Sequence, residues 1–543
     1  MKAFAALFAD LDATTSTQRK TDALVAYFQA APAADAAWAL YVLAGGKPRQ
    51  TVPSALIRRT AQEMAGIPEW LFDESHSVVG DLAETVALVL PPPQRVVEVP
   101  LHVWMQERLI ALRGREPATI AAALRGWWEE LDTPGRFLLT KLIGGQFRVG
   151  VARNLVVRAL AQAVGLDAKV LAERLMGYTD KHHTPDAATF HALVDPDHVA
   201  PAAGQPFPFY LAHPLQAPVE TLGDPADWLV EWKWDGIRAQ FVRRGGEAWL
   251  WSRGEDLLNG RFPEIDAAHG RLPDHTVLDG EIVVWRDGQV MPFALLQQRI
   301  GRRNVTRKVL ADAPVVFLAY DLLQLGGEDL RGLPQRERRA RLEALLPADP
   351  ASPLQLSPRV EAPDWPALAA LRAESRARGV EGFMLKHLDG RYGSGRTKDV
   401  GVWWKWKVDP YTIDAVLIYA QGGHGRRANL FTDYTFAVWD GDAADPEHPR
   451  RLVPFAKAYS GLTDEEIRAV DQRVRQTTTE KFGPVRSVTP SLVVELGFEG
   501  IQRSSRHKSG IAVRFPRMLR LRWDKPVDEA DSLATLRDLL PAP

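Results

Sequence analysis

The 543-residue chain contains no cysteine, which excludes disulfide bonds and metal sites built on thiolates. It also lacks any apolar run near the roughly 20 residues that a membrane span requires, so no membrane partner is expected. The chain also has no large excess of charge of either sign, since 67 basic and 68 acidic residues leave a net charge of −1. Binding to a polyanion must therefore come from local patches and not from the field of the whole protein.

What the chain does contain is typical of a globular protein, with 46% hydrophobic and 25% charged residues. Its length allows about two to four domains, each with its own core. The missing cysteines suit a reducing compartment. Together with the many alanines and arginines, they favour a cytoplasmic protein of bacterial type.

Roughly the first 200 residues predict helices. Short amphipathic segments begin at capping residues such as Thr17 or after Pro53, and several end at glycine or proline. The expected helices cover residues 17–28, 54–66, 80–90, 133–143 and 151–165. Short helices joined by short connections indicate an all-α domain.

The pattern changes near Pro206, where short β-rich runs begin to alternate with Gly and Asp turns. Strands are expected at 229–231, 239–243, 248–252, 276–285 and 315–323. Helices are expected at 292–300, 335–346 and 365–378. This mixture predicts an α+β domain built on sheets.

After Lys407 the chain again favours strands, at 413–420, 435–439, 452–459 and 492–498, with one helix at 464–474. Several strands and one helix in about 130 residues suit a small barrel such as an OB-fold. The predicted fold class is thus multidomain. An all-α domain spans 1–205, an α+β domain spans 206–408 and an all-β domain spans 409–543.

The most informative stretch is Lys233 to Arg238, which has the form K-x-D-G-x-R. Lys233 lies between Trp232 and Trp234 at the end of an aromatic-rich strand. A lysine that acts as a nucleophile must be partly desolvated and held still. In an isolated peptide, a lysine stem packed over aromatic rings is the more usual explanation of this pattern.

Further charged islands follow in order along the chain. Trp403 to Lys407 places Lys405 and Lys407 two residues apart, so both face the same side of a strand. The other islands are Ser252–Glu255, Leu278–Val283, Leu318–Leu323, Glu381–Lys386 and Leu521–Lys525.

Taken as an ordered set, these islands resemble the nucleotidyltransferase motifs of ATP-dependent DNA ligases. Leu521 to Lys525 is similar to the last motif of that family, R-x-D-K, and Phe498 to Ser504 resembles the block before it. Lys141 to Gly150 is similar to part of the family's DNA-binding domain. The resemblance covers nearly the whole chain. It implies a helical DNA-binding domain, a nucleotidyltransferase (adenylation) domain and an OB-fold domain.

The resemblance implies that Lys233 attacks ATP, carries AMP as a phosphoramidate and passes it to the 5′-phosphate of a nick, which the 3′-OH then seals. Clustered cations lower the pKa of such a lysine, and Mg²⁺ suits hard oxygen ligands. The implied metal ligands are Glu281 and Glu381, and the implied nucleotide-binding residues are Glu231, Arg238, Arg253, Glu281, Tyr320, Lys386, Lys405 and Lys407. Within that set, Glu231 is expected to read the adenine amino group and Tyr320 to stack on the base, whereas Arg238 and Arg253 contact ribose or the nick phosphate.

For the first step, the resemblance implies that Arg522, Asp524 and Lys525 orient pyrophosphate. Lys141, Arg148 and Arg153 are expected to bind DNA, although a simple turn between helices explains the Gly144-Gly145 segment as well. The implied cofactors are ATP and Mg²⁺. The implied partner is nicked duplex DNA, bound by a monomer in the bacterial cytosol.

Three alternatives remain. An RNA ligase or an mRNA-capping guanylyltransferase resembles only the central and OB parts, so the large helical region argues against both. An NAD-dependent ligase would need a cysteine-ligated zinc finger. A non-catalytic nick-binding protein would not need Lys233, Glu281 and Glu381 intact.

Two positions depart from the family pattern. Tyr320 stands where phenylalanine is more usual, which keeps the ring and adds a hydroxyl that needs a partner. Asp399 stands where an arginine often precedes the lysines of the fifth motif, with Arg396 and Lys398 nearby. The role of that arginine is therefore in doubt, and Asp235 has no assigned role.

Overall fold

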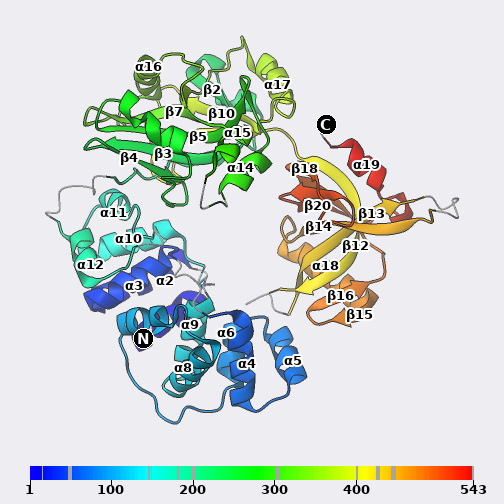
Figure 1. Cartoon of the computed structure of the whole chain (residues 1–543). Helices are drawn as coiled ribbons and strands as arrows, with labels where there is room; N and C mark the ends of the chain where they lie inside the picture. Colours follow the sequence, from blue (N-terminus) through cyan, green and yellow to red (C-terminus); the bar gives the residue numbers. More distant parts are fainter. Residues whose placement is uncertain are drawn as a thin grey trace. The chain divides into compact units, whose positions relative to one another are not determined.

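The computed structural model describes residues 1–14, 16–46, 52–144, 147, 150–179, 183–196, 204–300, 302, 305–398, 401–423, 429–441 and 448–540. Its contacts form two compact units (Figure 1). Unit 1 comprises Met1–Thr51, Glu98–Ala111 and Gly145–Val408, and unit 2 comprises Val52–Val97, Leu112–Gly144 and Asp409–Pro543. No helix within the described ranges has both the length and the hydropathy needed to cross a bilayer.

The N-terminal part of unit 1 is helical, and its helix ends follow from local capping. Ser16 caps α2 by accepting a hydrogen bond from the Arg19 amide at 3.3 Å, and Gly165 ends α10 with a φ of 72°. The elements are α1 (Lys2–Ala13), α2 (Thr17–Ala30), α3 (Ala33–Leu43), α7 (Leu101–Val103), η1 (Trp104–Leu109), η2 (Ile110–Leu112), α10 (Arg153–Val164), α11 (Ala168–Arg174) and α12 (Ala187–Val194).

Two sheets form the rest of unit 1. The four-stranded sheet has the order β1 (His213–Pro214), β11 (Trp403–Lys407), β10 (Gly382–His387) and β2 (Trp228–Trp232). The other sheet has the order β4 (Glu247–Ser252), β3 (Ile237–Arg244), β5 (Thr276–Arg286), β7 (Val315–Leu325) and β8 (Glu328–Asp329), with β6 (Gln289–Val290) and β9 (Leu354–Leu356) beside this path. Because β2 and β3 belong to different sheets, the segment from Lys233 to Gly236 crosses from one sheet to the other.

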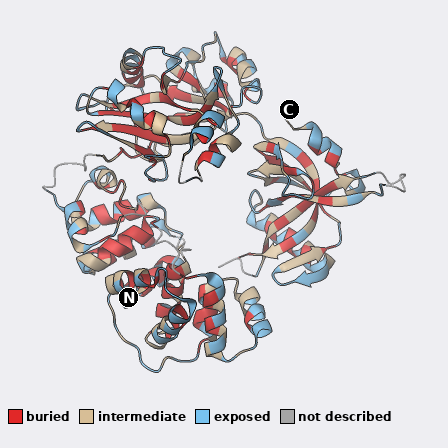
Figure 2. Cartoon of the chain, viewed as in Figure 1, coloured by how far each residue is buried: buried red, intermediate tan, exposed pale blue. Residues whose placement is uncertain are grey.

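The larger sheet holds the core of this part of the chain. β5 and β7 are buried along most of their length, as the red strands in Figure 2 show. The apolar side chains of these strands pack with those of neighbouring strands and helices. The resulting core includes Phe241, Leu278, Phe317 and Leu342. The helices of this part are η3 (Val219–Leu222), η4 (Pro225–Asp227), α13 (Pro263–Asp266), η5 (Ala267–Arg271), α14 (Phe293–Ile300), α15 (Arg307–Asp312), α16 (Gln335–Leu345) and α17 (Trp365–Ala373).

Unit 2 combines helices with a β-rich C-terminal part. Its helices are α4 (Ser54–Ala65), α5 (Glu69–Val79), α6 (Leu82–Val89), α8 (Pro117–Glu129), α9 (Thr133–Gly144), α18 (Asp464–Thr477), η7 (Val527–Glu529) and α19 (Leu533–Asp538). One sheet joins β14 (Arg451–Ala458), β13 (Phe431–Asp440), β12 (Tyr411–Gly422), β16 (Val485–Val488) and β15 (Thr478–Phe482), and β12 also pairs with β17 (Val493–Phe498), which pairs with β20 (Arg517–Arg522). A separate two-stranded sheet contains β18 (Gly500–Arg503) and β19 (Ile511–Arg514).

The predicted fold class is confirmed: a helical N-terminal region, a central α+β region and a β-rich C-terminal region follow one another. One helix is shorter than predicted, because α17 ends at Ala373 and not at Arg378. The Ser375 hydroxyl donates to the Arg372 carbonyl at 2.6 Å, and such a local bond competes with the helical pattern. Other elements were not predicted, among them the helices α3, α5, α8, α11, α12 and α19 and the strands β1, β6, β8, β9, β15, β16 and β18 to β20.

Candidate active site

Lys233 lies directly after β2 and continues the backbone pairing of that strand. Its amide donates to the Gly382 carbonyl at 2.8 Å, and its carbonyl accepts from the Glu381 amide at 2.9 Å. The Lys233 ammonium forms an ion pair with Glu381, and Lys407 lies 3.3 Å from the same carboxylate. The predicted nucleophile, one predicted metal ligand and one predicted phosphate-binding lysine thus meet at one point.

A glycine brings this point close to the second sheet. A Cβ at Gly236 would collide with the Ile282 carbonyl oxygen and would lie 2.9 Å from Cγ of Glu281. Only glycine therefore lets the chain pass this close to β5. Because Gly236 has no side chain, the segment that carries Lys233 can lie beside Glu281 of β5.

Glu281 is the second predicted metal ligand, and its pKa is raised to about 8. Burial is the main cause, since it disfavours the carboxylate, and Asp279 and Glu381 add repulsion. The charges of Lys233 and Arg238 act in the opposite direction and are outweighed. Glu281 is therefore a buried carboxyl group that binds its proton more tightly than usual.

The residues described contain no group of three or more His, Asp or Glu side chains arranged to hold a metal ion. Mg²⁺ in nucleotide sites is usually held by one or two carboxylates together with substrate phosphates. Glu281 and Glu381 fit that pattern, because the two carboxyl groups are close enough for Glu381 to raise the pKa of Glu281. The donor set is consistent with a divalent ion that arrives with a nucleotide.

Arg238 points away from solvent, toward a cluster that the sequence analysis missed. Its guanidinium contacts the Asp279 carboxylate at 2.7 Å and donates to the Tyr210 carbonyl at 2.5 Å, while the Tyr392 hydroxyl donates to Asp279 at 2.6 Å. Asp279 lies two residues before Glu281 on the same strand, so the alternation of side chains in β5 was a signal for it. Tyr210 and Tyr392 carried no comparable local signal.

Glu231 is almost fully buried, with 1% of its surface exposed. It lies between two cations, 2.6 Å from Lys386 and 2.8 Å from Arg339. If the Glu231 carboxylate also contacts a nucleotide base, it must do so while it is paired with Lys386 and Arg339. Arg339 was not predicted, although its place three residues before the buried Leu342 in α16 puts it near the core face of that helix.

Tyr320 faces the same cations. The Lys386 ammonium lies 4.3 Å from the centre of its ring, and the Trp403 ring meets it edge-on at 6.3 Å. Burial raises the pKa of the Tyr320 hydroxyl well above its usual value.

Lys405 and Lys407 lie opposite Met384 and Gly382 in the pairing of β11 with β10. Arg253 is exposed, and its amide donates to the Arg238 carbonyl at 3.0 Å.

The two sheets together carry seven of the residues predicted to bind nucleotide or metal. Glu231, Lys386, Lys405 and Lys407 belong to the four-stranded sheet, and Arg238, Glu281 and Tyr320 belong to the larger one. The sequence analysis counted cations around Lys233 but not the acids that pair with them. Three of those cations have carboxylate partners here, since Lys407 contacts Glu381, Lys386 contacts Glu231 and Arg238 contacts Asp279.

The residues predicted to orient pyrophosphate are described within unit 2. Arg522 and Lys525 contact the Asp414 carboxylate at 2.9 and 2.8 Å, and Arg522 also contacts Asp524 at 3.0 Å. Asp414 was not predicted. It lies in β12, more than 100 residues before its partners, so no spacing in the sequence pointed to it.

Two of the three predicted DNA-binding residues have partners within the protein. Lys141 forms an ion pair with Asp81, and Arg153 forms one with Glu255 and donates to the Leu175 carbonyl at 3.0 Å. Burial lowers the pKa of Arg153 to about 10. Arg148 and Asp399 lie outside the described residues.

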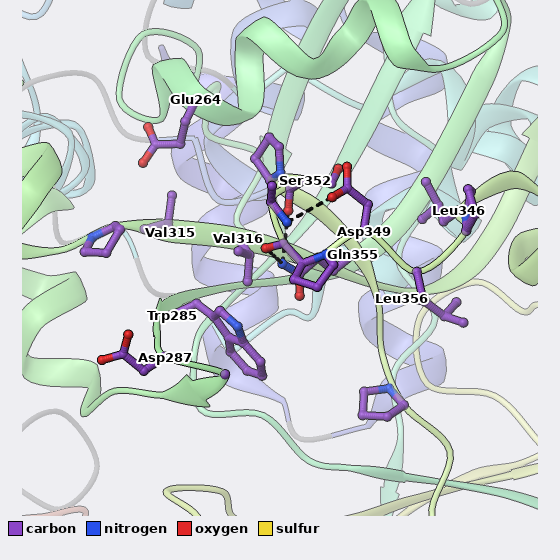
Figure 3. A pocket seen from close by; sticks show the side chains of 18 of the residues that line it. Glu264, Trp285, Asp287, Val315, Val316, Leu346, Asp349, Ser352, Gln355 and Leu356 are labelled. Atoms are coloured by element: carbon purple, nitrogen blue, oxygen red, sulfur yellow. Dashed lines mark hydrogen bonds between the residues drawn. The ribbon is translucent and has the colours of Figure 1, made fainter.

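A large pocket exists elsewhere in unit 1. It has a volume of about 990 Å³, and Figure 3 shows Trp285, Leu346 and Asp349 around it. None of the predicted nucleotide-binding residues lines it. Size alone therefore does not locate the candidate site, which is defined by its converging charges.

Comparison with known proteins identifies the family of the chain. Three family descriptions match the chain: "DNA ligase N terminus" at residues 1–161, "ATP dependent DNA ligase domain" at 209–407 and "ATP dependent DNA ligase C terminal region" at 427–525. A probable DNA ligase of Koribacter versatilis (strain Ellin345) is 31% identical over 97% of this chain and 95% of its own length.

A probable DNA ligase of Opitutus terrae (strain DSM 11246 / JCM 15787 / PB90-1) is 37% identical over 78% of this chain, and the match spans 48% of that relative, about half its length. The solved structure "Pmar-Lig_Pre." has a TM-score of 0.62 at 15% identity, covers 96% of this chain and 99% of that one, and shares the fold. The chain belongs to the family of ATP-dependent DNA ligases.

Proposed function

We propose that this protein seals nicks between a 3′-OH and a 5′-phosphate in duplex DNA, using ATP. The Lys233 amine loses a proton and attacks the α-phosphorus, and pyrophosphate leaves. An oxygen of the nick 5′-phosphate then attacks the same phosphorus, and the P–N bond to Lys233 breaks. Finally the 3′-OH loses its proton and attacks the 5′-phosphorus, and AMP leaves. Covalent catalysis of this kind divides one difficult displacement into easier steps.

The observation that carries this proposal is the meeting of Lys233, Glu381 and Lys407 beside Glu281, whose pKa is raised by burial. Phosphoryl transfer depends mostly on positioning and on neutralising charge. A lysine amine, two carboxylates and a further cation supply both requirements. Mg²⁺ bound by Glu281 and Glu381 would neutralise charge on the triphosphate and on the leaving pyrophosphate.

The remaining roles belong to the same proposal. Glu231 reads the amino group of adenine and Tyr320 stacks on the base, while Lys405 and Lys407 hold the α-phosphate beside Lys386. Arg238 and Arg253 contact the ribose or the nick phosphate. Arg522, Asp524 and Lys525 orient pyrophosphate in the first step. Lys141, Arg148 and Arg153 contribute to DNA binding by the monomer, for which Lys141 must exchange its present partner Asp81 for phosphate.

A labelling experiment tests the chemistry directly. The protein is incubated with Mg²⁺ and with ATP, GTP or NAD that carries label in its nucleoside monophosphate part. Label is expected to enter the protein only from ATP, to be lost in Lys233→Ala and to move onto nicked duplex DNA. Lys308→Ala is the matched control, because Lys308 is an exposed lysine of α15.

Two results would contradict the proposal. Label entering only from GTP would indicate a guanylyltransferase, and no label from any nucleotide would favour a nick-binding protein without catalysis. Salt offers a second check, since phosphate contacts make DNA binding strongly dependent on ionic strength. Sealing should therefore fall with added salt much more steeply than formation of lysyl-AMP.

A further inference from the structure

The loop after β4 carries Arg253 and contains a buried acid with an unusual backbone conformation. Glu255 has a φ of 63°, in the left-handed region, and only 7% of its surface is exposed. This conformation is sterically unfavourable for a residue other than glycine. Interactions of the Glu255 side chain are needed to offset that cost.

Those interactions come from a segment far earlier in the chain. The Glu255 carboxylate accepts hydrogen bonds from the Gly177 amide and the Thr179 hydroxyl, each at 3.3 Å. It also forms an ion pair with Arg153, which is fixed in turn by the Leu175 carbonyl. The acid is thus held by the end of the helical region, between α10 and the turn that follows α11.

The loop itself is short and internally bonded, so it transmits the position of Glu255 to its neighbour. The Glu255 amide donates to the Ser252 carbonyl at 2.9 Å, and the Ser252 amide donates to the Asp256 carbonyl at the same distance. The Arg253 amide donates to the Arg238 carbonyl at 3.0 Å. Arg253 is therefore placed between one anchor in the sheet and one anchor on the helical region.

We infer that Glu255 is a positioning residue that orients Arg253 by fixing its loop to the helical region. This inference rests on the proposed function, in which Arg253 contacts the ribose or the nick phosphate. Through Glu255, the packing of residues 153–179 against the loop would affect the position of Arg253 in the nucleotide site. Arg153 then serves the loop, in addition to any contact with DNA.

A second ion pair joins the same two regions and supplies a matched control. Glu173 in α11 contacts Arg331 at 2.6 Å, in the turn after β8. This pair connects the helical region to the sheet domain without touching the Arg253 loop. Its loss tests the effect of weaker docking alone.

The experiment compares Glu255→Gln, Glu255→Gly and Glu173→Gln in the full chain. Glutamine keeps the shape and removes the charge, and glycine removes the side chain but relieves the backbone strain. Both Glu255 variants should lower kcat/KM for nick sealing about tenfold or more. Glu173→Gln should stay within about twofold of the original protein. Thermal midpoints of all three identify any loss that comes from unfolding, and Glu255→Gly remains informative if Glu255→Gln folds poorly.

A double variant separates positioning from general support. If Glu255 acts through Arg253, adding Glu255→Gln to Arg253→Ala should cause no further loss, because effects in one unit are not additive. The inference is overturned by additive losses, by an equal loss in Glu173→Gln, by normal sealing in Glu255→Gln or by normal sealing in Arg253→Ala. Failure of the unaltered protein to seal nicks would instead refute the proposed function.

Discussion

Among single residues, Glu281 is the acid whose proton affinity is most changed by its surroundings in the candidate site. Its pKa of about 8 means that the folded protein without ligands holds a proton on this group at neutral pH. Binding of a divalent cation favours the carboxylate form, so it should release that proton. Loading of the site is therefore expected to depend on pH.

Replacing Glu281 with glutamine should change how stability depends on pH. Because the folded pKa lies above the ordinary value of 4.5, the acid contributes stability that is complete below about pH 4.5 and is lost as pH rises through about 8. Thermal midpoints from about pH 5 to about pH 9 should therefore fall for the original protein relative to Glu281→Gln. Glu247→Gln, which alters an exposed glutamate of β4, is the control. Parallel pH curves for all three proteins would contradict the raised pKa.

Among the elements, α16 stands out because two adjacent arginines on it are fully buried. Arg338 contacts Asp321 at 2.8 Å, directly after Tyr320, and Arg339 contacts Glu231, two residues before Lys233. Arg339 also donates to the Ser357 carbonyl at 2.7 Å. The helix α16 thus supports both β7, which carries Tyr320, and β2, which leads into Lys233.

Arg339→Met should therefore weaken both the fold and the first step. Breaking a buried pair by removing one partner costs about 3–5 kcal/mol, and formation of lysyl-AMP should slow because β2 loses an anchor. Arg341→Met is the matched control, since Arg341 lies on the same helix in an exposed pair with Glu328 that is worth about 0–1 kcal/mol. Urea unfolding and single-turnover labelling measure the two effects. Equal behaviour of the two variants would show that the buried contact is unimportant.

On the scale of the whole molecule, the residues of the last motif lie in a different unit from Lys233. Within unit 2 they are held by Asp414, whose own amide donates to the Asp531 carboxylate at 2.7 Å. This acid orders Arg522 and Lys525 before any nucleotide is present. Its charge is therefore expected to matter for the step that these residues serve.

Asp414→Asn should slow lysyl-AMP formation and leave sealing of a pre-adenylated nick nearly unchanged, because pyrophosphate takes part only in the first step. Loss of charge-assisted bonds of about 1.5–3 kcal/mol corresponds to about a ten- to hundredfold lower rate. Asp440→Asn, which alters a more exposed pair with Arg451 at 3.4 Å, is the control. An equal loss in both steps would indicate damage to the C-terminal fold.

The sequence predicted well what is local. The strand that ends just before Lys233, the strand that begins just after Glu381, the helix caps and the order of the three regions all depend on neighbouring residues. They were placed within a few positions. The partners Asp279, Arg339 and Asp414 were missed because ion pairs across a fold join residues that are 40 to more than 100 positions apart. Burial of Glu231 was missed for the same reason, since its partners Arg339 and Lys386 lie far along the chain.

The position of the candidate site between two separately hydrogen-bonded sheets has a further consequence. A nucleotide held by β2, β10 and β11 on one side and by β3, β5 and β7 on the other would act as a non-covalent cross-link between them. A ligand that binds only the assembled form raises the free energy of taking the sheets apart. Loading the site with AMP should thus make the central region unfold more cooperatively, so that the reaction intermediate is also the state most resistant to proteolysis.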